Sequence, residues 1–184
     1  MNYIKNTTSM NIAIYYGNLN PITINDVGVI TSIFNNLDID KIWVIVNSKI
    51  GSLNAKQKIK ICNNELKHIK NVRVDQSFGL PLNEYVEYYK NTFVDDEFYI
   101  VSSPHAFNNY DSELLKNNKF IVSNGFIYDD RKEMAKSVSM VYNHNILINE
   151  RTIIEYIEQG KNPEPFISHK SHMYLKRIIN ENKT

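Results

Sequence analysis

The sequence has 184 residues, of which 21 are lysine or arginine and 20 are aspartate or glutamate, so the formal net charge is +1. This length predicts one domain with a sizeable core and excludes a second full domain. Since neither sign of charge gathers into long runs, a nucleic-acid-binding tail and a polybasic membrane patch are also excluded, and the expected partners are small molecules or other proteins.

The only cysteine, Cys62, cannot form an internal disulfide, and its apolar helical surroundings indicate a small packed side chain. The start, "MNYIKNTTSM", is too polar for the core of a signal peptide, and no apolar run approaches the roughly 20 residues of a membrane helix. We therefore expect a cytoplasmic location, with residues 1–10 forming an N-terminal extension.

In chain order, short apolar runs alternate with segments of helical periodicity. The runs of strand length cover residues 12–16, 41–48, 71–77, 97–103 and 119–124, and the helical segments cover residues 26–37, 53–69, 82–93 and 112–117. Regular alternation with right-handed crossovers predicts an α/β class fold, a Rossmann-like doubly wound parallel sheet, over residues 11–160.

Beyond residue 130 the pattern changes. Residues 148–160 have a polar start, an apolar stripe and a terminal Gly160, which predicts a capped helix. The proline-containing segment 161–165 ends it, and residues 172–179 predict a last helix. We interpret residues 161–184 as a C-terminal helical tail, which is a contact in a homo-oligomer, a lid over a pocket or a trailing helix.

The stretch "GNLNPITINDVG" (residues 17–28) directly follows the first apolar run. A strand, a tight turn of Gly, Asn and Pro, and a helix N-terminus form an anion pocket in α/β proteins, because free backbone N–H groups and the helix dipole converge there. The sequence therefore predicts a phosphate-binding pocket at this turn.

The longer stretch "IAIYYGNLNPITINDVG" resembles the N-terminal signature of the HIGH-motif nucleotidyltransferases, which include the nicotinate and nicotinamide mononucleotide adenylyltransferases and phosphopantetheine adenylyltransferase. Their pattern is a strand followed by Gly-x-Phe-x-Pro-x-[His/Thr]-x-Gly-His. The positions that keep this layout are Gly17, Leu19, Pro21 and Thr23. Asn25 and Asp26 stand where the pattern has Gly and the His that contacts the ATP phosphates.

The resemblance extends over roughly residues 11–160. "SLNAK" (52–56) looks like the Ser-Leu-Glu-Glu-Arg that opens the family's second helix, which places Lys56 at the basic position. Residues 71–86 are similar to a segment of the pantetheine branch, and residues 146–160 resemble the ending of the pyridine-nucleotide branch.

A second family signature, Ile-Ser-Ser-Thr-x-x-Arg, supplies an Arg for the triphosphate. The nearest segment is "SVSMVY" (137–142), which keeps Ser137 and Ser139 but has Tyr142 in the Arg position. An alternative register uses "FISHKSH" (166–172), whose Lys170 would supply the cation. We prefer the first, because the second lies after the closing helix.

Several residues of this pocket have two interpretations, one structural and one functional. Asp26 in the first turn of a helix stabilises it by about 1 kcal/mol, or it is a metal ligand beside the phosphates. Thr23 donates to a phosphate or caps the helix. Lys49 and Lys56 reach a triphosphate or are solvated.

Three histidines are candidate ligands. His105 follows the strand at 97–103, where the ligand crevice of a parallel sheet lies, but a loop histidine is more often incidental. His169 and His172 lack a Cys or a further His at metal-site spacing, so no zinc site is predicted.

The resemblance implies adenylyl transfer from ATP, with Mg²⁺, to a pyridine mononucleotide, so a small-molecule nucleotide is the expected partner. The implied catalytic positions are Thr23, Asp26 and Lys56, and the implied nucleotide-binding positions are Gly17, Asn18, Asn20, Thr23, Lys49, Ser137 and Ser139. The alternative is a protein that keeps the fold and some nucleotide affinity without catalysis, serving as a binding or assembly module. Asn25, Asp26 and Tyr142 motivate this alternative.

Overall fold

The computed structural model describes residues 9–47, 51–142 and 150–181. These residues form one six-stranded parallel sheet with the strand order β3-β2-β1-β4-β5-β6. The strands are β1 (Asn11–Gly17), β2 (Lys41–Val46), β3 (Val72–Gln76), β4 (Glu97–Ser102), β5 (Lys119–Ser123) and β6 (Ser137–Val141). The predicted Rossmann-like doubly wound parallel sheet is thereby confirmed.

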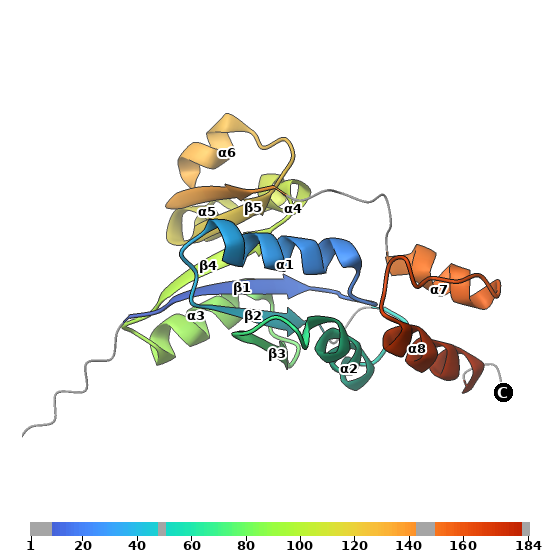
Figure 1. The fold of residues 1–184 in the computed structure, drawn as a ribbon. Coiled ribbons are helices and arrows are strands. Elements are labelled where there is room, and N and C mark those ends of the chain that lie inside the picture. Colours follow the sequence, from blue (N-terminus) through green and yellow to red (C-terminus); the bar gives the residue numbers. More distant parts are fainter. Residues whose placement is uncertain (1–8, 48–50, 143–149, 182–184) are drawn as a thin grey trace, which may run out of the picture.

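Helices cover both faces of the sheet (Figure 1). They are α1 (Ile24–Asn36), α2 (Ala55–Leu66), α3 (Leu82–Thr92), α4 (Pro104–Asn109), α5 (Ser112–Asn117), α6 (Asp129–Met134), α7 (Glu150–Glu158) and α8 (His169–Glu181). One core cluster joins the sheet to side chains of α1, α2, α7 and α8, and the other joins it to α3, α4 and α5.

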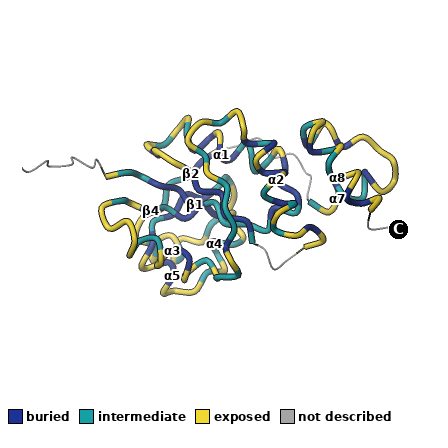
Figure 2. Tube along the Cα trace, turned by 90° about the horizontal axis from the view of Figure 1, so that it is seen from below, coloured by how far each residue is buried: buried dark blue, intermediate teal, exposed yellow. Residues whose placement is uncertain are grey.

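The centre of the sheet is fully apolar. In β1 the residues Ile12, Ala13 and Ile14 are completely buried, and β1 lies between β2 and β4 with Ile14 opposite Trp43 and Ile100. Figure 2 shows these strands as the buried interior of the molecule. Continuous apolar runs are typical of parallel strands that are covered on both faces, which is why the sequence predicted them.

Helix starts follow ordinary capping chemistry. Asn54 precedes α2, and its side chain accepts a hydrogen bond from the backbone N–H of Gln57 at 3.0 Å. The Gln57 side chain in turn accepts from the Asn54 backbone N–H at 2.9 Å. This reciprocal pair satisfies two N–H groups at the helix start, and so the start of α2 is fixed at residue 55.

Three short elements were not predicted: α4, α6 and β6. The helices α4 and α6 bury at most one side chain each and so lack an apolar stripe, and the segment of β6 was matched to a phosphate signature instead of a strand. The last helix begins at His169, three residues before the predicted start, and buries Leu175 and Ile178 in the same cluster as α1 and α2. Among the described residues no helix is both long and apolar enough to cross a bilayer.

Candidate active site

A cavity of about 220 Å³ lies at the carboxyl ends of β1, β4 and β5. These ends meet where the strand order changes direction, between β1 and β4, which is the ligand crevice of open α/β sheets. Polar lining groups come from the β1 turn, from the first turns of α1 and α7, and from the ends of β4 and β5. They include Asn18, Asp26, Ser102, Ser123 and Glu150.

The turn after β1 is held by the loop after β2. Leu19 adopts a left-handed conformation with φ of 47°, and the Asn20-Pro21 peptide bond is cis. The Asn20 side chain accepts from the Leu53 backbone N–H at 2.9 Å and donates to Ser52 Oγ at 3.3 Å. Asn20 therefore joins two loops, and its amide is already used within the fold.

Asp26 is bonded to two neighbouring residues. One carboxylate oxygen accepts from the Tyr15 hydroxyl at 2.6 Å. The other accepts from the backbone N–H of Thr23 at 2.7 Å and from the Thr23 hydroxyl at 2.8 Å. Burial raises the pKa of the Tyr15 phenol well above its ordinary value, and the Asp26 carboxylate adds to this shift, so Tyr15 stays a hydrogen-bond donor.

A buried lysine lies behind the turn. Lys58 is completely buried on α2, and its ammonium donates to Asn18 Oδ1 and to the Asn47 backbone oxygen, both at 2.9 Å. The Asn18 amide donates to Glu150 Oε2 at 3.1 Å. Asn18 thus connects a positive and a negative side chain across the turn.

Burial shifts the titration of both charged groups. It lowers the pKa of the Lys58 ammonium, and the negative charge of Glu150 opposes part of that shift. Burial raises the pKa of the Glu150 carboxyl, against a hydrogen bond from the Asn20 backbone N–H and together with repulsion from Asp26. Burial thus disfavours the charged form of both groups, and their mutual attraction opposes part of each shift.

Comparison with known proteins shows what this chain is similar to. No protein-family model matches the chain. A probable nicotinate-nucleotide adenylyltransferase of Borrelia hermsii is 26% identical over 165 residues, which are 82% of this chain and 87% of that protein. Two solved structures of Plasmodium falciparum nicotinic acid mononucleotide adenylyltransferase, one complexed with APC and one with NaAD, share the fold. Their TM-scores are 0.78 and 0.77 at 17% and 16% identity, and each match covers 94% of this chain and 96% of the solved chain.

The chain is thus similar in sequence to a probable nicotinate-nucleotide adenylyltransferase, and it has the fold of the solved nicotinic acid mononucleotide adenylyltransferases. The resemblance that the first strand, turn and helix carry is thereby confirmed. Among the described residues, the charged side chains that line the cavity are Asp26 and Glu150, and the Lys58 ammonium is bonded to Asn18 behind them. A phosphate chain entering this cavity meets more negative than positive charge.

Those two carboxylates suit one cofactor. Mg²⁺ prefers oxygen ligands, and it is usually held by one or two carboxylates together with phosphate oxygens of a substrate. Asp26 and Glu150 line the same cavity and interact electrostatically. The residues present therefore fit a magnesium ion that arrives with a nucleotide.

The turn residues predicted for the site lie in or beside the cavity. Gly17, Asn18 and Asp26 line it. Thr23 is 5% exposed and lies behind Asp26, to which its hydroxyl donates. Asn20 is bonded to the loop at residues 51–53, as described above, and is not a lining residue.

The described residues that were predicted outside the turn do not line the cavity. Lys56 is exposed on the first turn of α2, and Lys49 falls outside the described residues. Ser137 and Ser139 lie on the edge strand β6, paired with Lys119 and Ile121 of β5, and neither lines the cavity. His105 is exposed on α4, whereas its neighbours Ser103 and Ala106 line the cavity.

Two charged residues of the site, Lys58 and Glu150, were missed, and Lys58 had a signal in the sequence. Lys58 precedes Cys62 and Leu66 by four and eight residues, so it lies on the buried face of α2. A lysine on the apolar stripe of a helix beside a predicted phosphate turn marks a buried cation. Glu150 had no comparable signal, because its role depends on where α7 meets the turn after β1.

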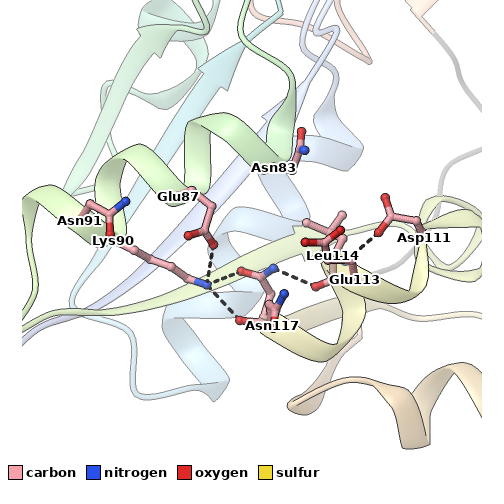
Figure 3. Close-up of a pocket in the computed structure, with 9 residues that line it drawn as sticks. Asn83, Glu87, Lys90, Asn91, Asp111, Glu113, Leu114 and Asn117 are labelled. Carbon is pink, nitrogen blue, oxygen red and sulfur yellow. Dashed lines mark hydrogen bonds and ion pairs between the residues drawn. The ribbon is translucent and has the colours of Figure 1, made fainter.

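A larger hollow of about 630 Å³ lies between α3 and α5 (Figure 3). The Lys90 ammonium at its floor donates to Asn118 Oδ1 at 2.7 Å and to the Asn117 backbone oxygen at 3.0 Å, and it lies 3.5 Å from a Glu87 oxygen. Its central polar groups thus pair with one another, and the hollow is not at the crevice of the sheet. We therefore assign the site to the smaller cavity.

Proposed function

We propose that this protein transfers the adenylyl group of ATP to nicotinate mononucleotide and releases pyrophosphate. The observation that carries the proposal is the place of the cavity, at the crevice between β1 and β4 of a nucleotidyltransferase fold. The Borrelia relative is named for this activity, and the Plasmodium enzyme of the same fold was solved complexed with NaAD.

In this reaction a phosphate oxygen of the acceptor attacks the α-phosphorus of ATP, and the bond to pyrophosphate breaks. The protein's task is to position the two nucleotides and to neutralise developing negative charge. Lys58 would supply positive charge through Asn18, which it holds in the turn. Asp26 and Glu150 would hold Mg²⁺, which when bound neutralises charge on the phosphates.

A second function is favoured by the bonding of Asp26. Both of its oxygens are engaged with Tyr15 and Thr23, which is the bonding of a helix-stabilising residue. A carboxylate about 4 Å from a phosphate adds repulsion of about 1 to 4 kcal/mol. The loss of one well-placed donor raises a reaction barrier by about 3 to 4 kcal/mol. Both effects favour a nucleotide-binding protein with weak or lost turnover.

Pyrophosphate release separates the two functions. The assay uses ATP and Mg²⁺ with nicotinate mononucleotide, nicotinamide mononucleotide or phosphopantetheine. Turnover of the native chain with nicotinate mononucleotide supports the transferase. ATP binding without turnover supports the second function, and turnover with another acceptor replaces the proposed substrate.

Variants at the motif positions sharpen this assay. Asp26→His together with Asn25→Gly restores the residues of the family pattern, and we expect faster turnover or tighter ATP binding than in the native chain. The matched control is Asp130→His, because Asp130 is an exposed acid in the first turn of α6. If Asp130→His raised turnover or ATP affinity as much as the double variant, Asp26 would not face the phosphates.

The cytoplasm is proposed as the location, in keeping with Cys62, the only cysteine of the sequence, which is a buried free thiol. Fractionation of the native cells with an antibody against the chain tests this.

A further inference from the structure

Three side chains converge where α8 begins. Glu164, in the turn before the helix, has one oxygen 2.7 Å from His169 Nδ1 and 3.0 Å from His172 Nδ1. The ligand atoms of the three residues all lie within 4.8 Å of one another. The sequence spacing excluded a zinc site for want of a Cys or a third His, but a carboxylate supplies the third position.

These groups have the chemistry and access of a metal site. Imidazole nitrogen and carboxylate oxygen are standard zinc ligands, and sites with three protein ligands leave a position for water. The side chains of His169, Glu164 and His172 are 73%, 35% and 15% exposed, so an ion can reach them while His172 is held by packing. A zinc ion about 2 Å from each ligand atom requires the two contacts between Glu164 and the histidines to widen by a few tenths of an ångström, and the two histidine nitrogens already lie within 4.8 Å of each other.

We propose that Glu164, His169 and His172 bind a zinc-class divalent cation, with water completing its coordination. Imidazole ligands favour Zn²⁺, Cu²⁺ and Ni²⁺ over Mg²⁺ and Ca²⁺, which separates this ion from a magnesium that accompanies a nucleotide. The site lies apart from the cavity at β1 and β4, so the proposal does not depend on the proposed function.

The cation would stabilise a segment that already holds the fold together. In the segment from residue 163 to 168, the Phe166 carbonyl accepts from the Ile24 backbone N–H at 3.1 Å, at the start of α1. The Ser168 hydroxyl donates to a Glu65 oxygen at 2.6 Å, at the end of α2. Metal binding would therefore link α8 more firmly to the helix that carries Asp26.

The same cluster has a second explanation without metal, in which Glu164 only accepts hydrogen bonds from the two rings. Those bonds, from His172 first and then His169, lower the pKa of the Glu164 carboxyl. The two explanations differ in their response to added metal, because the hydrogen-bonded cluster alone predicts no saturable uptake.

The test is calorimetric titration of the full, untagged chain with zinc chloride. We expect uptake of one Zn²⁺ per chain, with affinity reduced at least about tenfold in Glu164→Gln and further in His169→Ala with His172→Ala. The control is His105→Ala, which removes an exposed histidine of α4 and leaves uptake unchanged. Magnesium chloride should give no comparable uptake.

Thermal unfolding with and without metal gives a second readout. At a Zn²⁺ concentration about 100-fold above Kd we expect the midpoint of the native chain to rise by about 5 °C or more. The rise should persist in His105→Ala and disappear in the double variant. Absence of saturable uptake by the native chain, or uptake that the double variant retains in full, would overturn the proposal. Circular dichroism confirms that each variant is folded.

Discussion

Two segments hold the first turn of α1, and they use their polar groups differently. In the turn after β1 and the first turn of α1, the polar side chains bond to other side chains of the fold. Asn18 bonds to Lys58 and Glu150, and Asp26 bonds to Tyr15 and Thr23. The segment before α8 contacts α1 through a backbone carbonyl and leaves the cluster at Glu164 at the surface.

The difference shows what each segment can offer a ligand. At the turn, the side chains are bonded to one another, so a nucleotide must replace some of those hydrogen bonds or bring a cation with it. Before α8, the two rings share one carboxylate oxygen, and the His169 ring is mostly exposed, so a cation can enter from solvent without breaking the core. In the turn after β1 the same side chains line the cavity and hold the fold together. In the segment before α8 the backbone holds the fold, and the side chains of the cluster are separate from that contact.

The largest effect is expected for Lys58→Met, which would break the hydrogen-bond network of Lys58, Asn18 and Glu150. The change keeps the length of the side chain but removes the ammonium that donates to Asn18 Oδ1 and to the Asn47 carbonyl, and it removes a counter-charge of Glu150. We expect the free energy of unfolding to fall by about 3 kcal/mol in urea titrations. ATP affinity should fall at least about tenfold, because the turn loses its cation.

Lys56→Met is the matched control for this change, since Lys56 is exposed on the same helix. We expect its free energy of unfolding to stay within about 0.5 kcal/mol of the native value. If Lys56→Met weakened ATP binding more than Lys58→Met, the phosphate-binding cation would be the one that the family resemblance implied.

A smaller effect is expected for Gly51→Ala, which disturbs the contact between the two loops. Gly51 has φ of 110°, and an added Cβ would lie 2.5 Å from Asn20 Cγ. We expect a loss of about 2 kcal/mol in the free energy of unfolding.

The control for this prediction is Gly160→Ala, where φ is 70° and an added Cβ would meet nothing within 4 Å. It carries the backbone strain alone, and we expect a loss of about 1 kcal/mol. Equal losses in the two variants would show that the loops tolerate separation at Asn20.

The sequence predicted the sheet well because its strands are continuous apolar runs. It placed β1, β2 and α1 within a few residues, and the proline turn identified the site. Residues 137–140 of β6 alternate between serine and an apolar side chain, which is the pattern of a half-buried strand, but the segment was matched to a phosphate signature instead.

The site was predicted in part, for a physical reason. Gly17, Asn18 and Asp26 are local to one turn, so their proximity follows from chain order. Glu150 reaches the same cavity from 132 residues beyond Asn18, and only the packing of α7 brings it there. Spacing along a chain reveals contacts within a turn or a helix, and it gives no information on contacts between distant elements.

The smallest effect is expected for Glu150→Gln, which keeps the shape of the side chain and its capacity to accept from Asn18. Burial raises the pKa of the Glu150 carboxyl in the folded state, so the folded chain binds this proton more tightly than the unfolded chain. Folding stability due to this group therefore falls as the pH rises from the ordinary range of Glu through the raised value. Gln removes that dependence.

The free energy of unfolding of Glu150→Gln and of the native chain should thus agree at acidic pH, and the variant should be more stable by about 1 kcal/mol or less at neutral pH. The same change removes one of the two negative charges at the cavity, so ATP should bind more tightly in the absence of Mg²⁺. With Mg²⁺ present, ATP should bind less tightly to Glu150→Gln than to the native chain, because the ion loses a carboxylate ligand. Tighter ATP binding under both conditions would show that Glu150 only repels the nucleotide and takes no part in holding a metal.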